Sequence, residues 1–294
     1  MLQRLYPRIP IQSFLRSVPK TATFYNSNIG IKTTLFASFS SNSYKLSAEN
    51  VEETPEQPKV FKRFWKASTF ELTDEGYIIK LDQRILKMTN GEKLVISKNQ
   101  KAFAALISGE WEMQEKTLGG HSLPLTSIAF RARESLQEED ARKKVISALL
   151  KYYITDTILF HSEFPENLVE LQKECWDPII EWAQNKFDIE IKITNGIFSQ
   201  IQPKKSIDIL EEHLNTYCPQ KLAAFEKAVM VSKSFLIGLA LIERQLSVEQ
   251  AAKAARIEVL AQTSFWGTFE SAHEFDESLI KQDLGATVCS TIGL

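Results

Sequence analysis

The sequence predicts an α+β protein in which a small β-rich N-terminal domain is followed by an all-α helical bundle domain. Three observations lead to this prediction. Short segments rich in β-forming residues lie between positions 61 and 96, around a tight-turn dipeptide. From Pro165 onward, apolar residues recur at helical spacing almost without interruption. The length of 294 residues allows one large domain or two smaller ones, at roughly 100–200 residues each.

Residues 1–48 have the composition of a mitochondrial transit peptide. They contain six basic residues, no Asp or Glu, and many hydroxyl residues. A secretory signal would need one continuous apolar block, which Arg16 interrupts here. The alternative to a transit peptide is a disordered tail. The sign of the charge then reverses, because residues 49–60 contain four Glu and two Pro. We interpret this second segment as a disordered acidic linker with too little apolar surface to fold.

Charge and cysteine content exclude several classes of protein. The 246 residues after the predicted transit peptide hold 29 basic and 37 acidic side chains, a balance unsuited to a nucleic-acid backbone. The three cysteines, Cys175, Cys218 and Cys289, form no CxxC pair and no pattern of a disulfide framework, and such a sequence suits a reducing compartment. The longest apolar run, residues 235–242, is far short of the roughly 20 residues that span a bilayer. We therefore expect no nucleic-acid partner and no transmembrane segment.

The β-containing domain is predicted to cover residues 61–160. Residues 64–72 and 76–82 are candidate strands, and residues 84–88 and 93–96 flank Asn90-Gly91. This dipeptide accepts positive φ in a tight hairpin turn. A small, antiparallel, hairpin-rich sheet is therefore expected to open the folded part of the chain.

Helical spacing begins directly after the predicted sheet. Ser97 and Gln100 have the spacing of a capping box, and Gly119-Gly120 is a natural stop. The apolar stripe between them consists of Phe103, Leu106, Ile107 and Trp111. A second helix is predicted over residues 138–152, and a short strand over 156–161.

The helical domain is predicted to cover residues 161–294. Asp177 is placed to cap a helix with Pro178 in its first turn, and Ser247 with Gln250 forms another capping-box pattern. Alternating β-branched residues interrupt the helical pattern at 189–194. The predicted helices of this domain cover residues 165–175, 178–187, 203–217, 219–244 and 247 to about 265.

Motifs of common enzymes are missing from the sequence. No P-loop and no glycine-rich dinucleotide motif occurs, and none of the four histidines has zinc-ligand spacing. Residues 120–124 resemble a nucleophile elbow, but Pro124 replaces the second glycine, so a loop is the better interpretation. Cys175 lies beside Glu174 and Asp177, which disfavour a thiolate. We expect no metal, no cofactor and no catalytic residue.

The densest cluster of unusual residues lies near the end of the sequence. On one continuous helix, Glu258, Gln262, Trp266 and Glu270 would line a single stripe, since each is four residues from the next. Such a stripe is either a polar binding surface or a set of contacts between packed helices. Glu270, His273 and Asp276 can also be drawn as an acid–base group, which gives the alternative of a mitochondrial matrix enzyme.

An ordered set of residues between positions 61 and 276 carries a resemblance to a known family. The set consists of Arg63-Phe64, residues 76–82, Arg84, Leu86-Lys87, Glu110-Trp111, residues 124–126, Asp156-Thr157, Leu168, Gln172, residues 176–178, Trp182, Arg256, Glu258, Gln262, Trp266-Gly267, Glu270 and Ala272-His273. With these residues the sequence resembles the mitochondrial assembly chaperones that guard the alpha subunit of the ATP synthase F(1) head.

The resemblance implies a function for the cluster near the end of the sequence. It implies a monomeric matrix protein, not an enzyme, that binds the unassembled alpha subunit until the beta subunit takes its place. Trp111 is expected to support the core of the N-terminal domain. A stably incorporated subunit of the synthase is a third possibility beside the enzyme. The implied contact residues are Glu270, with Trp266, Gln262, Glu258 and His273 around it.

Overall fold

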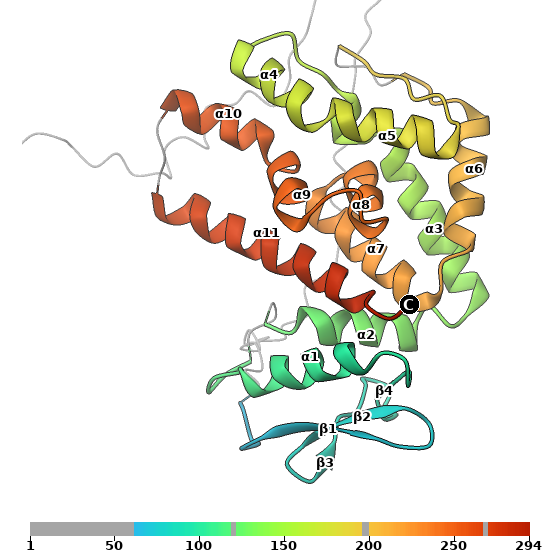
Figure 1. Cartoon of the computed structure of the whole chain (residues 1–294), viewed down its shortest axis with the longest axis vertical. Coiled ribbons are helices and arrows are strands. Elements are labelled where there is room, and N and C mark those ends of the chain that lie inside the picture. The colour runs from blue at the N-terminus through green and yellow to red at the C-terminus, as the bar shows by residue number, and fades with distance from the viewer. Residues whose placement is uncertain (1–61, 119–121, 196–199, 267–269) are drawn as a thin grey trace, which may run out of the picture. The chain divides into compact units, whose positions relative to one another are not determined.

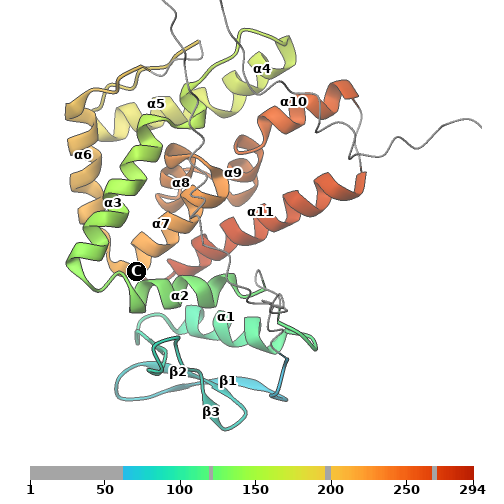
Figure 2. The same ribbon diagram turned by 180° about the vertical axis from the view of Figure 1, so that it is seen from behind.

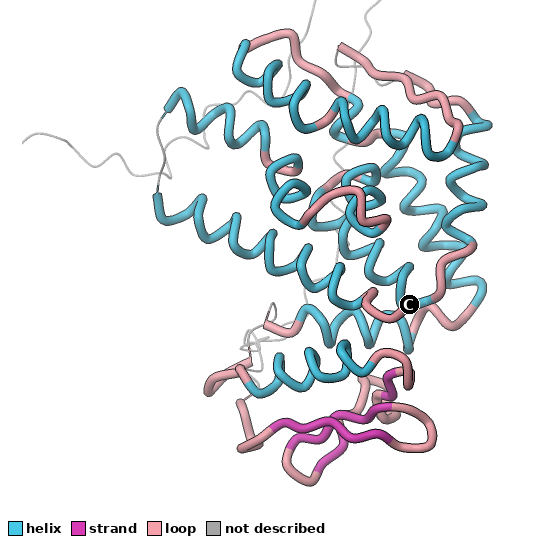
Figure 3. Tube along the Cα trace, viewed as in Figure 1, coloured by secondary structure: helices cyan, strands magenta, loops and turns pink. Residues whose placement is uncertain are grey.

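A small antiparallel sheet opens the part of the chain that the structure describes. The computed structural model describes residues 62–118, 122–195, 200–266 and 270–294, without the side chains of 265, 266 and 270–274. The strands are β1 (Ser68–Leu72), β2 (Tyr77–Leu81), β3 (Arg84–Ile85) and β4 (Val95–Ile96). Strand β2 pairs antiparallel with each of the other three. Figure 3 shows this sheet at one end and helices over the remainder, so the predicted α+β class is confirmed.

Two details of the predicted sheet differ from the structure. Strand β1 begins at Ser68 and not at residue 64, because the backbone N–H groups of Lys66 and Ala67 bond to the Asp82 carboxylate. Strands β3 and β4 do not pair with each other, since both pair antiparallel with β2; between them the chain makes a tight turn closed by an antiparallel bridge of Lys87 and Lys93 and by the N–H of Leu94, which donates to the carbonyl of Leu86 at 3.0 Å. Of the predicted turn dipeptide, only Gly91 takes a positive φ, at 86°.

Two helices follow the sheet, and only the first was predicted. Helix α1 (Lys101–Glu112) packs on β1 and β2, and α2 (Pro124–Glu134) packs on α1. The predicted capping box at α1 is wrong, because the Gln100 side chain sits at the N-cap and makes no capping hydrogen bond. The helix ends at Glu112, before the predicted stop at 119–120, which lies outside the described residues. The core between sheet and helices contains Trp65, Tyr77, Ile79, Leu81, Leu86, Met88, Leu94, Ile96, Phe103, Ala104, Ile107, Trp111 and Ala129.

Helices make up most of the remaining described chain. These helices are α3 (Glu139–Ile154), the short 3-10 helix η2 (Thr157–Leu159), α4 (Glu166–Cys175), α5 (Asp177–Phe187), α6 (Lys204–Asn215), α7 (Pro219–Ser232), α8 (Phe235–Ile242), α9 (Val248–Ala254), α10 (Ile257–Trp266) and α11 (Glu270–Ser290). Helix α8 is buried along its whole length, and α3, α5, α7 and α9 pack around it (Figures 1 and 2). Helix α2 contributes Ile128 and Ala132 to this helical core and Ala129 to the core beneath the sheet.

Two helices that the sequence predicts as continuous are each broken in the structure. The predicted helix over 219–244 splits because Lys233 takes a left-handed conformation at φ 56° and Ser234 caps α8. The predicted helix from 247 splits between α9 and α10, at Ala255 and Arg256. The capping box at its start is confirmed, since Ser247 and Gln250 exchange both hydrogen bonds.

Short segments around the helical core also correct the predictions. Residues 156–161 contain the 3-10 helix η2 in place of a strand, with Asp156 as its N-cap. Residues 189–194 interrupt the helical pattern as predicted, and Thr194 forms one parallel bridge with Phe160. Pro178 occupies the first turn of α5 as predicted, but Asp177 is the first helical residue and not the cap. The predicted domain division at residue 160 stays a prediction.

Candidate functional site

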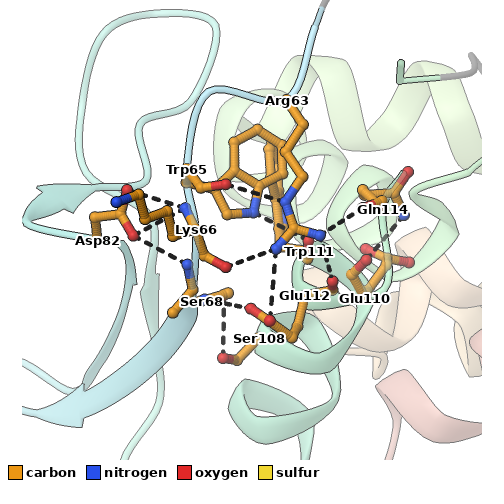
Figure 4. Close-up of polar contacts among 11 residues, drawn as sticks. Arg63, Trp65, Lys66, Ser68, Asp82, Ser108, Glu110, Trp111, Glu112 and Gln114 are labelled. Atoms are coloured by element: carbon orange, nitrogen blue, oxygen red, sulfur yellow. Dashed lines mark hydrogen bonds and ion pairs between the residues drawn. The ribbon is translucent and has the colours of Figure 1, made fainter. Parts of the chain in front are cut away.

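The motif residues of the N-terminal part form one structural network around Arg63 (Figure 4). The guanidinium of Arg63 donates to the backbone carbonyls of Glu112 at 2.8 Å and Gln114 at 2.6 Å. It also donates to the carbonyls of Trp65 at 3.0 Å and Lys66 at 2.8 Å. Arg63 therefore ties the chain before β1 to the end of α1, and its donors are occupied within the fold.

Trp111 lies at the centre of the same network. Its indole Nε1 donates to Thr126 Oγ1 at 2.9 Å, and its carbonyl accepts from Trp65 Nε1 at 3.2 Å. Glu110 accepts from the Thr126 hydroxyl at 2.5 Å and from the N–H of Leu125 at 2.7 Å, so it caps the start of α2. Burial raises the pKa of Glu110. The predicted core role of Trp111 is confirmed, and its neighbours serve the fold as well.

The central motif around Trp176 also supports the fold. Trp176 is buried, and its indole Nε1 donates to the carbonyl of Ala254 at 2.8 Å. The ring of His161 lies 5.8 Å from that of Trp176, and its Nε2 lies 3.8 Å from Asp177 Oδ1. Burial raises the pKa of the neighbouring Cys175 thiol, in keeping with a structural cysteine.

The five predicted contact residues lie on two helices. Glu258, Gln262 and Trp266 belong to α10, whereas Glu270 and His273 belong to α11. Figures 1 and 2 show these helices running in different directions, so the prediction of one continuous stripe is wrong. Glu258 and Gln262 are exposed, while the side chains of Trp266, Glu270 and His273 lie outside the described ones. The helix ends that carry Trp266 and Glu270 are only a few residues apart in the chain.

The two helices are held by different neighbours. Helix α10 packs on α4, where Asn167 Nδ2 donates to the carbonyl of Ala261 at 3.0 Å and to Ser264 Oγ at 2.6 Å. Helix α11 packs on α2, α7 and α9 through its C-terminal half, where Leu284 is fully buried. About two turns nearer the start of the helix, Phe275 and Asp276 are exposed. The N-terminal turns of α11 therefore extend past the core.

Sequence reasoning missed two features of this region. Phe275 on α11 is 64% exposed, next to the exposed Asp276, and isolated apolar residues give no signal of exposure in a sequence. Arg256, which belongs to the cluster of unusual residues near the end of the sequence, forms an ion pair with Glu277 of α11 at 2.5 Å. The residues are 21 positions apart on separate elements, so no helical spacing links them.

The alternative acid–base group gains no support from the described geometry. Asp276 is exposed, and the side chains of Glu270 and His273 are not described. Two cavities, of about 280 and 240 Å³, are lined by other residues, such as Arg133 and Cys218 for the first and Arg131 and Met230 for the second. Among the residues that the structure describes, no three His, Cys, Asp or Glu side chains gather as metal ligands.

Within the described parts of the chain, no helix combines the length and the hydrophobicity that crossing a bilayer requires.

Comparison with known proteins places the chain in a family. A sequence profile described as ATP12 chaperone protein matches residues 62–184. The protein named atp12, mitochondrial, of Schizosaccharomyces pombe is 32% identical over 235 residues, which cover 77% of this chain and 81% of that protein. The chain belongs to the ATP12 chaperone family. The mitochondrial ATP12 protein of Saccharomyces cerevisiae is 26% identical over 84% of this chain and 90% of its own length.

A solved structure of the ATP12 family has the same fold. The crystal structure of Atp12 from Paracoccus denitrificans superimposes with a TM-score of 0.64 at 27% identity, and covers 78% of this chain and 95% of that one. The resemblance drawn from the sequence is therefore confirmed at the level of the family. The two yeast relatives are named as mitochondrial proteins, and the family is named for chaperone activity.

Proposed function

We propose that this ATP12-family chaperone acts in assembly of the mitochondrial ATP synthase by binding the unassembled alpha subunit of its F(1) sector. The protein holds that subunit in the matrix until the beta subunit replaces it, and it does so as a monomer without hydrolysing ATP. Membership of the ATP12 chaperone family is the observation that carries this proposal. The basic, acid-free residues 1–48 support import into the matrix.

The physical task explains what such a surface needs. A subunit outside its complex exposes apolar interface that promotes aggregation. A chaperone can cover this interface with a surface of mixed polarity, so that binding is moderate and the final partner can displace it. The two helices supply such a mixture, because Glu258 and Gln262 are exposed on α10, and Phe275 and Asp276 are exposed on α11.

The contact residues of this proposal are those that the sequence indicates. Glu270 is assigned the central role, and Trp266, Gln262, Glu258 and His273 surround it. Two of them, Glu258 and Gln262, lie one turn apart on the exposed side of α10. Because α11 begins four residues after α10 ends, Trp266 and Glu270 belong to the same end of the helix pair.

Affinity capture from a mitochondrial matrix extract tests the proposal. The full-length chain is expressed in cells with a tag, and it is then recovered from the matrix extract with and without added ATP. The expected dominant partner is alpha subunit, in an amount that ATP does not change, and without an equal amount of beta subunit. Intact synthase in the eluate would instead make the protein a stable subunit. A folded bait without alpha subunit would reopen the matrix-enzyme alternative, whose turnover must depend on Glu270, His273 and Asp276.

A further inference from the structure

Arg256 and Glu277 connect the two helices of the proposed binding surface. Arg256 directly precedes α10, and its side chain is only 8% exposed. Its Nη1 donates to Glu277 Oε2 at 2.5 Å, which joins the base of α10 to the second turn of α11. The short charge-assisted contact is directional as well as attractive. An arginine this deeply buried is stable only with its charge compensated.

Within the described parts of the chain, the two helices pack mainly on different neighbours. Helix α10 is fixed to α4 through Asn167, whereas α11 is fixed to α2, α7 and α9. Neither helix packs extensively against the other within the described parts of the chain. The residues between Trp266 and Glu270 limit the separation of their Cα atoms only to about 14 Å. The ion pair at the base is therefore a direct link between two helices that otherwise pack on different neighbours.

The position of Glu277 on α11 makes the ion pair effective. Seven residues after Glu277 along α11, Leu284 is fully buried in the core. Directly before Glu277, Phe275 and Asp276 are exposed. Glu270 is fourteen residues from Leu284 along the helix. At about 1.5 Å per residue, a tilt of about 10° around Leu284 would move the backbone of Glu270 by about 4 Å. Such a shift exceeds the tolerance of a hydrogen-bonded contact with a partner.

We infer that Arg256 is a positioning residue, which holds the N-terminal turns of α11 at a fixed distance from α10 so that both helices meet the partner together. The inference rests on the proposed function for its consequence in binding, but the fixed distance is a property of the chain alone. Lys281 offers a matched comparison. It also pairs with Glu277, at 2.6 Å, but from within α11, so it has no part in the spacing of the helices.

The first measurement is the distance between the helices in the full-length protein without partner. Nitroxide labels are attached to cysteines at Gln262 and Asp276, with Cys175, Cys218 and Cys289 replaced by serine, and the distance distribution is recorded by pulsed electron resonance. We expect Arg256→Met to broaden or shift the distribution, and Lys281→Met to leave it unchanged. An unchanged distribution in a folded Arg256→Met variant overturns the inference.

The second measurement is binding of purified alpha subunit by the same variants without labels. We expect Arg256→Met to weaken binding by about tenfold, and Lys281→Met to bind as the unmodified protein does. Chemical denaturation of each variant checks that the folded state is retained. A distance change without any loss of binding overturns the positioning role. If the unmodified protein binds no alpha subunit, the proposed function fails, whereas the distance measurement still decides the role of the ion pair in the chain.

Discussion

Trp176 and Ala254 are joined by a buried hydrogen bond, in which the indole Nε1 donates to the backbone carbonyl at 2.8 Å. The two residues are 78 positions apart, and each is 2% exposed. Trp176 stands between α4 and α5, while Ala254 ends α9, just before the turn that leads to Arg256 and α10. The bond therefore fixes the base of the proposed binding surface to the helical core.

Loss of this bond should be costly even when an aromatic ring remains. Trp176→Phe removes the donor and leaves a buried carbonyl unpaired, so we expect the free energy of unfolding to fall by about 2 kcal/mol. Trp182→Phe is the control, because Trp182 is half-buried and the structure gives its indole no hydrogen bond to a described residue. The control should lose less than about 1 kcal/mol. Equal losses in urea denaturation would contradict the role of the bond.

Glu243 joins three helices through one carboxylate. It accepts from Lys186 at 2.6 Å, from Lys221 at 2.9 Å and from the Tyr217 hydroxyl at 2.6 Å, with His213 at 3.4 Å. We expect Glu243→Gln to lower the free energy of unfolding at pH 7 by about 2–4 kcal/mol. The matched control, Glu211→Gln on an exposed site of α6, should change it by less than about 0.5 kcal/mol.

The effect of Glu243 should also depend on pH. Hydrogen bonds, first from His213 and then from Lys186, hold the pKa of Glu243 well below its usual range. Because the pKa of Glu243 is lower in the folded state than in the unfolded state, the ionised carboxylate stabilises the folded state. This contribution is present above the unfolded-state pKa near 4.5 and is lost as the pH falls below it. The difference in unfolding free energy between the unmodified protein and Glu243→Gln should therefore shrink between pH 5 and pH 3. A constant difference would refute this explanation.

Asp156 should show the opposite dependence. Its carboxylate is fully buried and accepts from the N–H groups of Leu236 at 2.8 Å and Ile158 at 3.2 Å, but burial raises its pKa from 3.8 to about 6. Because the pKa of Asp156 is higher in the folded state than in the unfolded state, protonation of Asp156 stabilises the folded state. This contribution is complete below about pH 4 and is lost as the pH rises through about 6. The unfolding free energy of the unmodified protein, relative to Asp156→Asn, should fall by about 3 kcal/mol from pH 4 to pH 7. A carbon-13 NMR titration of Asp156 with a midpoint near 4 would disprove the shift.

The two glycines of the sheet turns provide a test of backbone constraint. Gly76 has φ +146°, and a Cβ there would collide with the carbonyl oxygen of Ile96. Gly91 has φ +86°, but a Cβ there would meet open space. We expect Gly76→Ala to reduce the unfolding free energy by about 3 kcal/mol or more, and Gly91→Ala by about 1 kcal/mol. Thermal unfolding of both variants measures this order, and the reverse order would show that the contact with Ile96 is relieved easily.

The sequence predicts the end of a helix correctly where the residues that determine that end lie close to it in the chain. The capping box of Ser247 and Gln250 is present, because both partners lie within one helical turn. The same spacing at Ser97 and Gln100 gives no capping box, since Gln100 occupies the N-cap and Ser97 instead accepts a backbone bond in the preceding turn. At the start of α8, the N–H of Leu236 bonds to Asp156, which is 80 positions away. Apolar periodicity cannot reveal such a distant partner.

The arrangement of the candidate site residues could not be predicted from the sequence. The spacing of Glu258, Gln262, Trp266 and Glu270 suggests one stripe only if the helix continues, whereas the structure begins a second helix at Glu270. The ion pair between Arg256 and Glu277 arises because that second helix returns beside the first. Which residues are unusual could be read from the sequence, but which of them meet depends on the turn between the helices.

Charge reversal at Glu270 tests the centre of the proposed binding surface. Glu270 is the first residue of α11, so lysine there opposes the helix dipole and costs about 0.5–1 kcal/mol, too little to unfold the protein. We expect Glu270→Lys to weaken alpha-subunit binding by about 100-fold or more. Glu249→Lys is the matched control, because Glu249 is exposed in the first turn of α9 and carries the same dipole cost. Binding by titration and unfolding by denaturant are measured for both variants. If Glu270→Lys unfolds, Glu270 is a structural residue; if both variants lose binding equally, the effect is one of overall charge, and in either case the assignment of Glu270 to the contact is wrong.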